Sequence, residues 1–215
     1  MPPVYLLPSR PSGKLPKGSS KFWGNPDLPS GCSFPSYIDC EGVSRPYFFI
    51  CQINLEDISR YDTEGILPHV GLLSFFAKIG CHLGHYDDEE CIGGTISEAD
   101  AVKVMYLPDS ETLKETAVPE IYMYHPVPDE LSISFRLDPA ESLEEHALFA
   151  PPTHRPWETW DHPFEDRQIL LQVDSFEGDD FVLNFMDVGV LDFLISPSDL
   201  KNRNFSDVRA IVLSS

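Results

Sequence analysis

Two aspartates in the last quarter of the chain are the first candidates for chemistry. Asp174 ends the apolar run ILLQVD, and Asp187 precedes a Val-Gly pair thirteen residues later. Two carboxylates brought together around a hairpin could act as general acid and base in a hydrolysis. The same side chains are equally suited to holding tight turns by accepting backbone N–H groups. Asn54 stands in the first half where Asp174 stands in the second, which favours the structural role.

Two glutamines lie inside otherwise apolar runs. Gln52 is part of FFICQIN and Gln172 is part of ILLQVD. The two amides could line a polar pocket between related halves of the molecule. A buried amide must in any case satisfy its donors and acceptor, so each glutamine is expected to bind backbone groups of a neighbouring loop or strand.

A group of thiols and imidazoles has the ligand types of a metal site. Its members are Cys81, His82, His85 and Cys91, and the acidic run 87–90 lies between His85 and Cys91. Zinc sites usually contain a close C-x₂₋₄-C pair, which is absent from this order, so no metal is predicted. Nucleophilic catalysis by Cys51 or Cys32 would need a neighbouring histidine, and Cys51 lies in a strand where burial makes a thiol inert.

The segment 154–164 is rich in aromatic residues and bounded by prolines. It contains Trp157, Trp160 and His162, with His154 and Phe164 at its ends. Large aromatic side chains in a loop either complete a core or anchor a partner protein. Both interpretations stay open, and Trp157, Trp160 and His162 are the predicted binding residues together with Gln52 and Gln172.

The charge balance narrows the classes of partner. The 215 residues carry 35 acidic and 15 basic side chains, a net charge of −20. Such a charge repels nucleic acid and anionic membranes and attracts a basic protein. No G-x-S-x-G, P-loop or dinucleotide-binding motif occurs, and no cofactor is indicated. The composition therefore favours a binding domain over an enzyme, although acidity also simply promotes solubility.

The five cysteines are odd in number and match no disulfide framework. The N-terminus lacks the apolar core of a signal peptide, and no stretch is long enough to span a membrane. Reduced thiols in the cytoplasm are the expectation.

Short apolar runs between turn residues predict a mainly β fold with a few short helices. Residues 1–20 are expected to be an extended arm, and the strands are expected at 47–55, 70–79, 101–107, 121–125, 131–137, 169–175, 181–185, 188–195 and 207–213. Asn54 and Ser196 are expected to cap short helices, and Asp138-Pro139 to open another that extends to about Leu148.

Two segments repeat one another. FICQIN (49–54) aligns with ILLQVD (169–174), and Gly71 and Gly189 follow the glutamines at distances of nineteen and seventeen residues. This similarity predicts a duplicated unit with two pseudo-symmetric antiparallel halves that share one core. Gly71 and Gly189 should then lie at equivalent backbone positions, either at φ > 0 or where another strand passes closely.

Several segments together resemble the YwqG-like family, a bacterial domain of unknown function. They are SKFWGNPDLP, FFICQINLEDI, GLLSFFA, ILLQVDS and MDVGVLDFLI, in this order along most of the chain. Phe185-Met186 replaces a Trp-Gly of the family pattern, and PWETWDHPF (156–164) replaces a glycine-rich turn. The resemblance implies a single domain over 1–215, divided into a first half-repeat (20–107), a connection (108–150) and a second half-repeat (151–215). It implies no activity.

The sequence thus predicts a non-catalytic, acidic domain of the immunity-protein or antitoxin type, which holds a basic protein. The alternative is a small hydrolase or ligand-binding enzyme with its site between the two halves. Nucleic acid and membrane partners are not expected.

Overall fold

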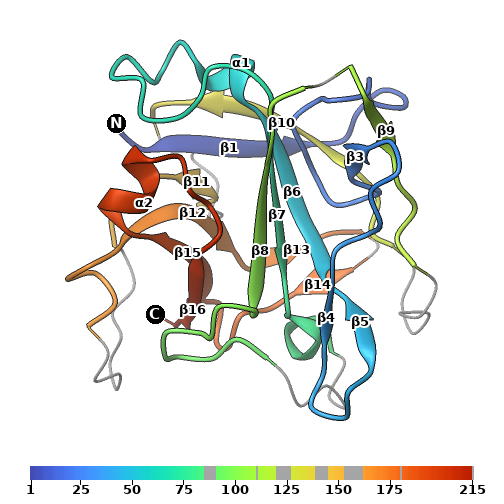
Figure 1. The fold of residues 1–215 in the computed structure, drawn as a ribbon, viewed down its shortest axis with the longest axis vertical. Coiled ribbons are helices and arrows are strands. Elements are labelled where there is room, and N and C mark those ends of the chain that lie inside the picture. Colours follow the sequence, from blue (N-terminus) through green and yellow to red (C-terminus); the bar gives the residue numbers. More distant parts are fainter. Residues whose placement is uncertain are drawn as a thin grey trace.

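A single curled sheet dominates the fold. The computed structural model describes residues 1–84, 91–109, 111–119, 127–138, 145–152, 162–179 and 181–214. Ten antiparallel strands follow the order β16-β15-β12-β11-β1-β10-β2-β6-β7-β8 and form a nearly closed sheet (Figure 1). The bounds are β1 Val4–Ser9, β2 Lys21–Phe22, β6 Phe48–Asn54, β7 Leu72–Ala77, β8 Val102–Leu107, β10 Leu131–Arg136, β11 Ala147–Leu148, β12 Gln168–Asp174, β15 Val190–Ile195 and β16 Arg209–Leu213.

Smaller elements decorate this sheet. Three two-stranded ribbons pair β3 (Asp27–Pro29) with β9 (Leu113–Glu115), β4 (Ser36–Ile38) with β5 (Ser44–Pro46), and β13 (Phe176–Glu177) with β14 (Val182–Leu183). The helices are α1 (Leu55–Ile58), α2 (Pro197–Lys201) and a 3₁₀ turn, η1 (Gly80–Leu83). The predicted mainly β fold with short helices is confirmed. Among the described residues, no helix reaches the length and apolarity required to cross a bilayer.

Both predicted caps are present. The Asn54 side chain accepts a hydrogen bond from the Glu56 amide at the start of α1, and Ser196 accepts one from Asp199 at the start of α2. Each cap satisfies an amide that has no partner within its helix. The helix expected after Asp138 falls largely on residues outside the described part, but its predicted end is wrong. Ala147–Leu148 is strand β11, because both residues are buried between β1 and β12.

The N-terminal segment is the main error in the predicted strands. Val4–Ser9, expected to be part of an arm, is strand β1 at the centre of the sheet, where it pairs with β10 and β11. Val4 and Leu6 alternate into the core, and this period of two is the strand signal. The prolines that surround it suggested a loop, since proline is uncommon in central strands. The predicted strand at 121–125 lies outside the described residues.

The two hairpins that contain the glutamines share one register. In β6–β7, Gln52 lies opposite Ser74 and the register shifts between Phe49 and Cys51. In β12–β15, Gln172 lies opposite Asp192 and the register shifts between Ile169 and Leu171. These pairings are the ones that a duplication requires. The duplication and its half-repeat boundaries stay predictions, which superposition of the two halves would test.

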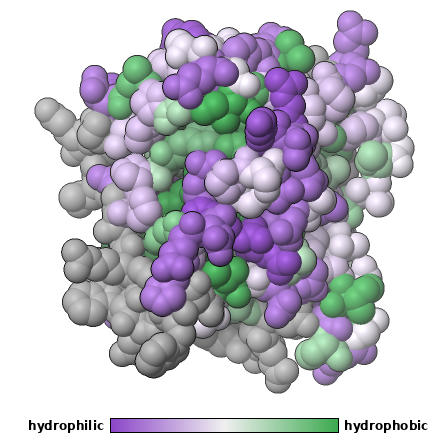
Figure 2. All heavy atoms as spheres, turned by 60° about the vertical axis from the view of Figure 1, so that its left-hand side comes forward, coloured by the Kyte–Doolittle hydropathy of each residue, from purple (hydrophilic) through white to green (hydrophobic). Residues whose placement is uncertain are grey.

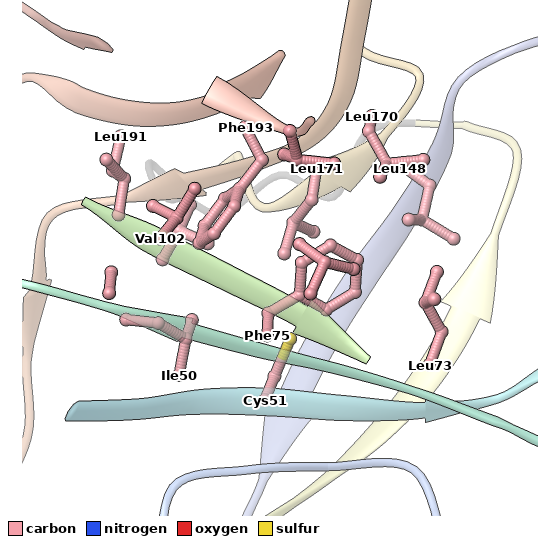
Figure 3. Close-up of a cluster of buried hydrophobic side chains, with 14 of the residues drawn as sticks. Ile50, Cys51, Leu73, Phe75, Val102, Leu148, Leu170, Leu171, Leu191 and Phe193 are labelled. Atoms are coloured by element: carbon pink, nitrogen blue, oxygen red, sulfur yellow. The ribbon is translucent and has the colours of Figure 1, made fainter. Parts of the chain in front are cut away.

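The interior of the curled sheet is the main core. Side chains from β6, β7 and β8 meet side chains from β11, β12 and β15 there (Figure 3). Phe75 and Phe193 contact each other across this interior with ring centroids 5.2 Å apart, and both are fully buried. Because opposite parts of the sheet pack directly on each other, the loops at its rim are held on a rigid frame.

Candidate functional site

The predicted acid pair is divided between two environments. The two carboxylate oxygens of Asp174 accept hydrogen bonds from the backbone amides of Glu145 (2.9 Å) and Ser175 (2.7 Å). Asp187 is exposed on the turn between β14 and β15. The contacts of Asp174 are those of a carboxylate that holds a turn, which was the structural interpretation of this residue.

Both glutamines bind backbone groups of neighbouring segments. The Gln52 amide nitrogen donates to the Ser19 carbonyl and to Asp27, and its oxygen accepts from the Asp27 amide at 2.9 Å. Gln172 donates to the Glu145 carbonyl. Since both are fully buried, these bonds offset the desolvation of the amides. The contacts fit a structural role for Gln52 and Gln172.

Two buried ionisable groups, one in β15 and one at the end of the connection, were missed by sequence reasoning. Asp192 lies opposite Gln172, and burial raises the pKa of its carboxyl to about 8. Burial lowers the pKa of His146 to about 4, while its Nδ1 accepts a hydrogen bond from the Asp174 amide. Within the described part of the chain, Asp192 Oδ1 and His146 Nε2 are buried without a hydrogen-bond partner. Both groups are therefore mostly neutral near pH 7.

The aromatic segment 154–164 is only partly within the described residues. Trp157 and Trp160 lie outside them, so their role stays a prediction. His162 is exposed and has a left-handed backbone (φ +44°), and its Nδ1 lies 3.9 Å from Glu165. Phe164 packs against the outer core cluster around Ile169 and Leu194, so the end of the segment contributes to the core.

A disulfide joins Cys81 to Cys91, with Cα atoms 6.2 Å apart. The expectation that all five cysteines are reduced thiols is therefore wrong for this pair. The spacing did not reveal this bond, because the five cysteines match no known disulfide framework. Cys51 is buried, as predicted, and burial raises the pKa of its thiol well above the usual value. A reactive thiolate is therefore disfavoured at Cys51.

The turn at 184–189 is the most unusual backbone feature of the rim. Met186 (φ +53°) and Val188 (φ +59°) both have left-handed conformations. The turn is fixed by bonds from the Gly189 amide to the Phe185 carbonyl (2.7 Å) and from the Asn184 amide to the His82 carbonyl (2.9 Å). A β-branched residue at positive φ is a genuine outlier, and such strain tends to occur at functional positions.

This turn also presents apolar side chains to solvent. Val188 is 70% exposed and Met186 is 45% exposed, with the aspartate Asp187 between them. Elsewhere, the surface that bears α2 and the C-terminal strands alternates between hydrophilic areas and separate hydrophobic patches (Figure 2). The turn thus exposes two apolar side chains and one carboxylate close together in sequence. We call this segment the 184–189 turn.

A mostly apolar cavity of about 330 Å³ is lined in part by η1 and β14, the elements next to this turn. Its walls come from the first half, from residues 118 and 127–128 and from the β13–β14 ribbon, and include Phe48, Ile79, Leu83, Val127, Pro128 and Phe181. Lys78 at its wall donates to Asp100 at 3.0 Å and lies over the Tyr37 ring. Asp174 and Asp187 are not among its lining residues, so the cavity suits an apolar ligand better than a hydrolytic substrate.

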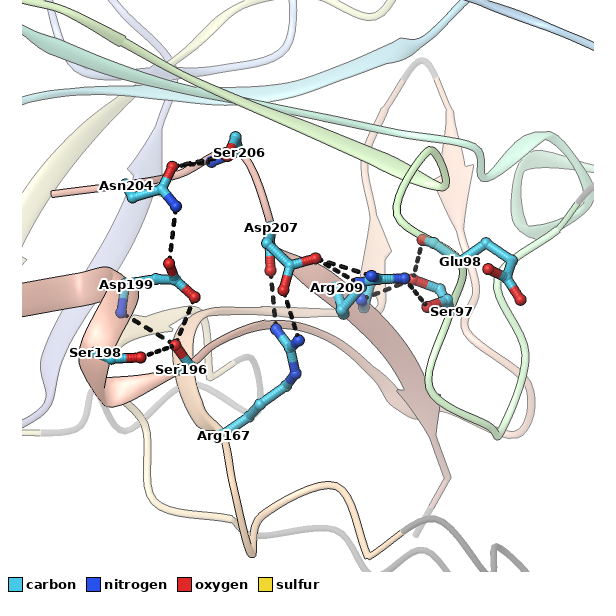
Figure 4. Close-up of polar contacts among 11 residues, drawn as sticks. Ser97, Glu98, Arg167, Ser196, Ser198, Asp199, Asn204, Ser206, Asp207 and Arg209 are labelled. Carbon is cyan, nitrogen blue, oxygen red and sulfur yellow. Dashed lines mark hydrogen bonds and ion pairs between the residues drawn. The ribbon is translucent and has the colours of Figure 1, made fainter. Parts of the chain in front are cut away.

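The best-connected polar cluster closes the loop between α2 and β16. Asp207 accepts from Arg167 (2.9 Å) and Arg209 (2.9 Å), while Asp199 bonds Ser196 and Asn204 (Figure 4). The hydrogen bond from Arg167, followed by that from Arg209, holds the pKa of Asp207 below its usual value. Two networks result, one around Asp207 and one around Asp199, and each holds this loop in place.

Comparison with known proteins gives a family without an assigned activity. No curated protein matches the chain. One family, described as a domain of unknown function (DUF1963), matches residues 20–159 and 146–212. The two matched ranges cover most of the chain and contain both glutamine hairpins and the 184–189 turn. The chain therefore belongs to the DUF1963 family.

Proposed function

We propose that this domain is a non-catalytic binding module that holds a basic protein. The observation that carries the proposal is the net charge of −20, from 35 acidic and 15 basic side chains. A field of this sign steers a basic partner into encounter and raises its association rate. An inhibitor of the immunity or antitoxin type must associate rapidly with the basic protein that it neutralises, and a strongly acidic surface provides this.

The 184–189 turn is the contact surface that the geometry supports best. Anchors of protein interfaces are apolar or aromatic side chains that become desolvated on binding. Val188 and Met186 are exposed before binding, and the hydrogen bonds of the turn hold them in place, so little ordering cost remains. Asp187 adds a carboxylate for a cationic group of the partner. Trp157, Trp160 and His162 remain the second predicted contact.

The strain at Val188 allows a sharp experiment. In Val188→Gly the left-handed backbone no longer costs free energy, so we expect the free protein to be more stable by about 1 kcal/mol. The same variant loses the apolar anchor, so dissociation of the complex should accelerate by about tenfold. The measurement pairs thermal melting of the free domain with kinetic binding to a partner isolated from the native host. Leu137→Ala, which truncates a comparably exposed apolar side chain on another element, is the control.

Electrostatic steering is tested by salt in the same assay. Between about 50 and 500 mM salt the Debye length falls from roughly 14 to 4 Å, so we expect the association rate to fall at least tenfold. The dissociation rate should change less. A salt-independent association rate would contradict the proposal, and so would a Val188→Gly variant that binds as tightly as the wild type.

The apolar cavity supports a second candidate, the binding of a small apolar ligand between the two halves. Its walls come from both halves of the chain. A ligand that binds there raises the melting temperature by mass action. The exposed cavity residue Val127, changed to Trp, should fill the space and abolish that shift. If this shift occurs and no basic partner exists, the alternative of a ligand-binding enzyme is favoured.

Two finer expectations belong with this proposal. The YwqG-like branch and a bacterial origin are supported by the five quoted segments and their order. The cytoplasmic location was expected because the cysteines were expected to be reduced. The Cys81–Cys91 disulfide weakens this expectation, because disulfides persist mainly in oxidising compartments.

A further inference from the structure

Three metal-ligating side chains converge at the end of the sheet that carries the 184–189 turn. Cys81 and His82 lie on η1, and Cys91 begins the segment that covers the edge strand β16 through the bond from the Val212 amide to the Gly93 carbonyl. The two sulfurs and a ring nitrogen of His82 all lie within 4.8 Å of one another. All three residues are partly exposed, so solutes can reach them.

The surroundings of His82 orient its ring for ligation. Its Nε2 lies 2.9 Å from the Ile92 carbonyl oxygen, which can only accept a hydrogen bond, so Nε2 carries the proton. This tautomer leaves Nδ1 with a free lone pair. The ring also packs edge-on against Phe185, with centroids 5.1 Å apart. A carbonyl behind a histidine is the usual arrangement that fixes the orientation of a metal ligand.

We infer that Cys81, His82 and Cys91 form a zinc site when the disulfide is reduced, so that the bond and the ion are alternative states of one cluster. A dithiol reductant supplies two electrons and two protons, the S–S bond breaks, and the reductant becomes a disulfide. Zn²⁺ then displaces the two thiol protons. The resulting Cys₂His set fills three positions of a tetrahedral ion and leaves the fourth for water or another exchangeable ligand.

The backbone already has the geometry for this change. Zinc–sulfur bonds of about 2.3 Å place two sulfurs about 3.8 Å apart in a tetrahedral site. Rotation of the two cysteine side chains provides this separation while the Cα atoms stay near their 6.2 Å distance. Two thiolates also neutralise the charge of the ion, and the acidic run 87–90 is adjacent in sequence. The inference is independent of the proposed protein partner.

The test compares one sequence in two redox states. The full chain is reduced with excess dithiol or left oxidised, freed of reductant, and given Zn²⁺ alone in the presence of a competing chelator. We expect one zinc per reduced chain by elemental analysis and none per oxidised chain. Replacing Zn²⁺ by Co²⁺ in the reduced protein should give a thiolate-to-cobalt charge-transfer absorption, which reports sulfur ligation directly.

Variants then assign the ligands. Cys81→Ser and Cys91→Ser should lose stoichiometric binding, and His82→Ala should weaken it by at least about tenfold. Cys32→Ser, the same change at an exposed cysteine outside the disulfide, should bind like the wild type. If a variant fails to fold, reduced wild-type protein with alkylated thiols replaces it. Equal zinc in both redox states, or undiminished binding after the loss of Cys81 or Cys91, would overturn the inference.

Discussion

At the scale of single residues, the buried groups Asp192 and His146 should contribute strongly to how stability depends on pH. Burial raises the pKa of Asp192 from 3.8 to about 8, so the folded protein keeps a proton that the unfolded chain releases, and stability falls as pH rises between these values. Burial lowers the pKa of His146 from 6.5 to about 4, so stability rises with pH between about 4 and 6.5. The two slopes oppose each other below pH 6.5.

Asp192→Asn separates these contributions. Of these two groups only Asp192 titrates above pH 6.5, so its contribution should lower the unfolding free energy of the wild type by about 2 kcal/mol between pH 6.5 and 8. The variant should lack this loss, and its stability should rise from about pH 4 to 6.5 without the opposing slope of Asp192. Denaturant unfolding at half-unit pH steps measures both curves. Parallel curves for the two proteins would show that Asp192 is ionised in the folded state.

Gly71 and Gly189 make the second residue-scale prediction. A Cβ at Gly71 (φ +90°) would lie 2.5 Å from the Leu107 carbonyl oxygen, and a Cβ at Gly189 would overlap the Leu213 carbonyl oxygen. Leu107 and Leu213 are the last residues of β8 and β16, so the expected close approach of a neighbouring strand is confirmed at both glycines. Gly71→Ala and Gly189→Ala should each cost on the order of 1–3 kcal/mol. Gly13→Ala, where a Cβ meets no atom within 4 Å, is the control in thermal melting.

At the scale of elements, the cap of α2 should contribute measurably to stability. Ser196 accepts from the Asp199 amide at 3.0 Å, and its replacement by alanine leaves that amide without its partner. We expect Ser196→Ala to lower the unfolding free energy by about 1 kcal/mol. Ser198→Ala should change it by less than about 0.5 kcal/mol, since Ser198 is exposed and its hydroxyl bonds only that of Ser196. Equal losses in the two variants would refute a specific capping effect.

The elements that the sequence predicted correctly are those with local physical causes. Asn54 and Ser196 indicate the starts of their helices because their side chains can cap the first turn. The strands β12 and β15 are long apolar runs. β1 and β11 owe their strand structure to partners far along the chain, β10 and β12, so their local composition is uninformative. The Cys81–Cys91 bond joins residues only ten positions apart, but their spacing matches no disulfide framework, and the strained turn has no local sequence signal. Left-handed backbone at Val188 contradicts local propensity, and the fold imposes it through the flanking strands.

At the scale of the whole molecule, the order of the sheet is symmetric about the β1–β10 pair. Each side continues through a short strand (β11 or β2), a glutamine strand (β12 or β6), its hairpin partner (β15 or β7) and an edge strand (β16 or β8). The duplication predicted from the 49–54 and 169–174 segments requires such an order, and it stays a prediction until the two halves are superposed. The polar residues opposite the glutamines differ, Ser74 in one half and Asp192 in the other, so any site built on them belongs to one half only.

The net charge leads to the last prediction, which concerns the free protein and needs no partner. The chain has 35 acidic and 15 basic side chains, so its excess negative charges repel each other in the compact fold. This self-repulsion opposes folding. Raising monovalent salt from 10 to 150 mM shortens the Debye length from about 30 to 8 Å, so distant repulsions are screened while the core is unaffected. We expect a stabilisation on the order of 1 kcal/mol, seen as a rise in melting temperature of about 2–4 °C for a chain of this size.

The control is the triple variant Glu98→Gln, Asp166→Asn, Glu177→Gln, whose three carboxylates are exposed and make no hydrogen bond or ion pair within the described ranges. Removing three charges should raise the melting temperature at 10 mM salt and flatten its dependence on salt. A melting temperature that is independent of salt in the wild type would mean that local pairs already compensate the acidic charge, and long-range steering of a basic partner would then lose its physical basis.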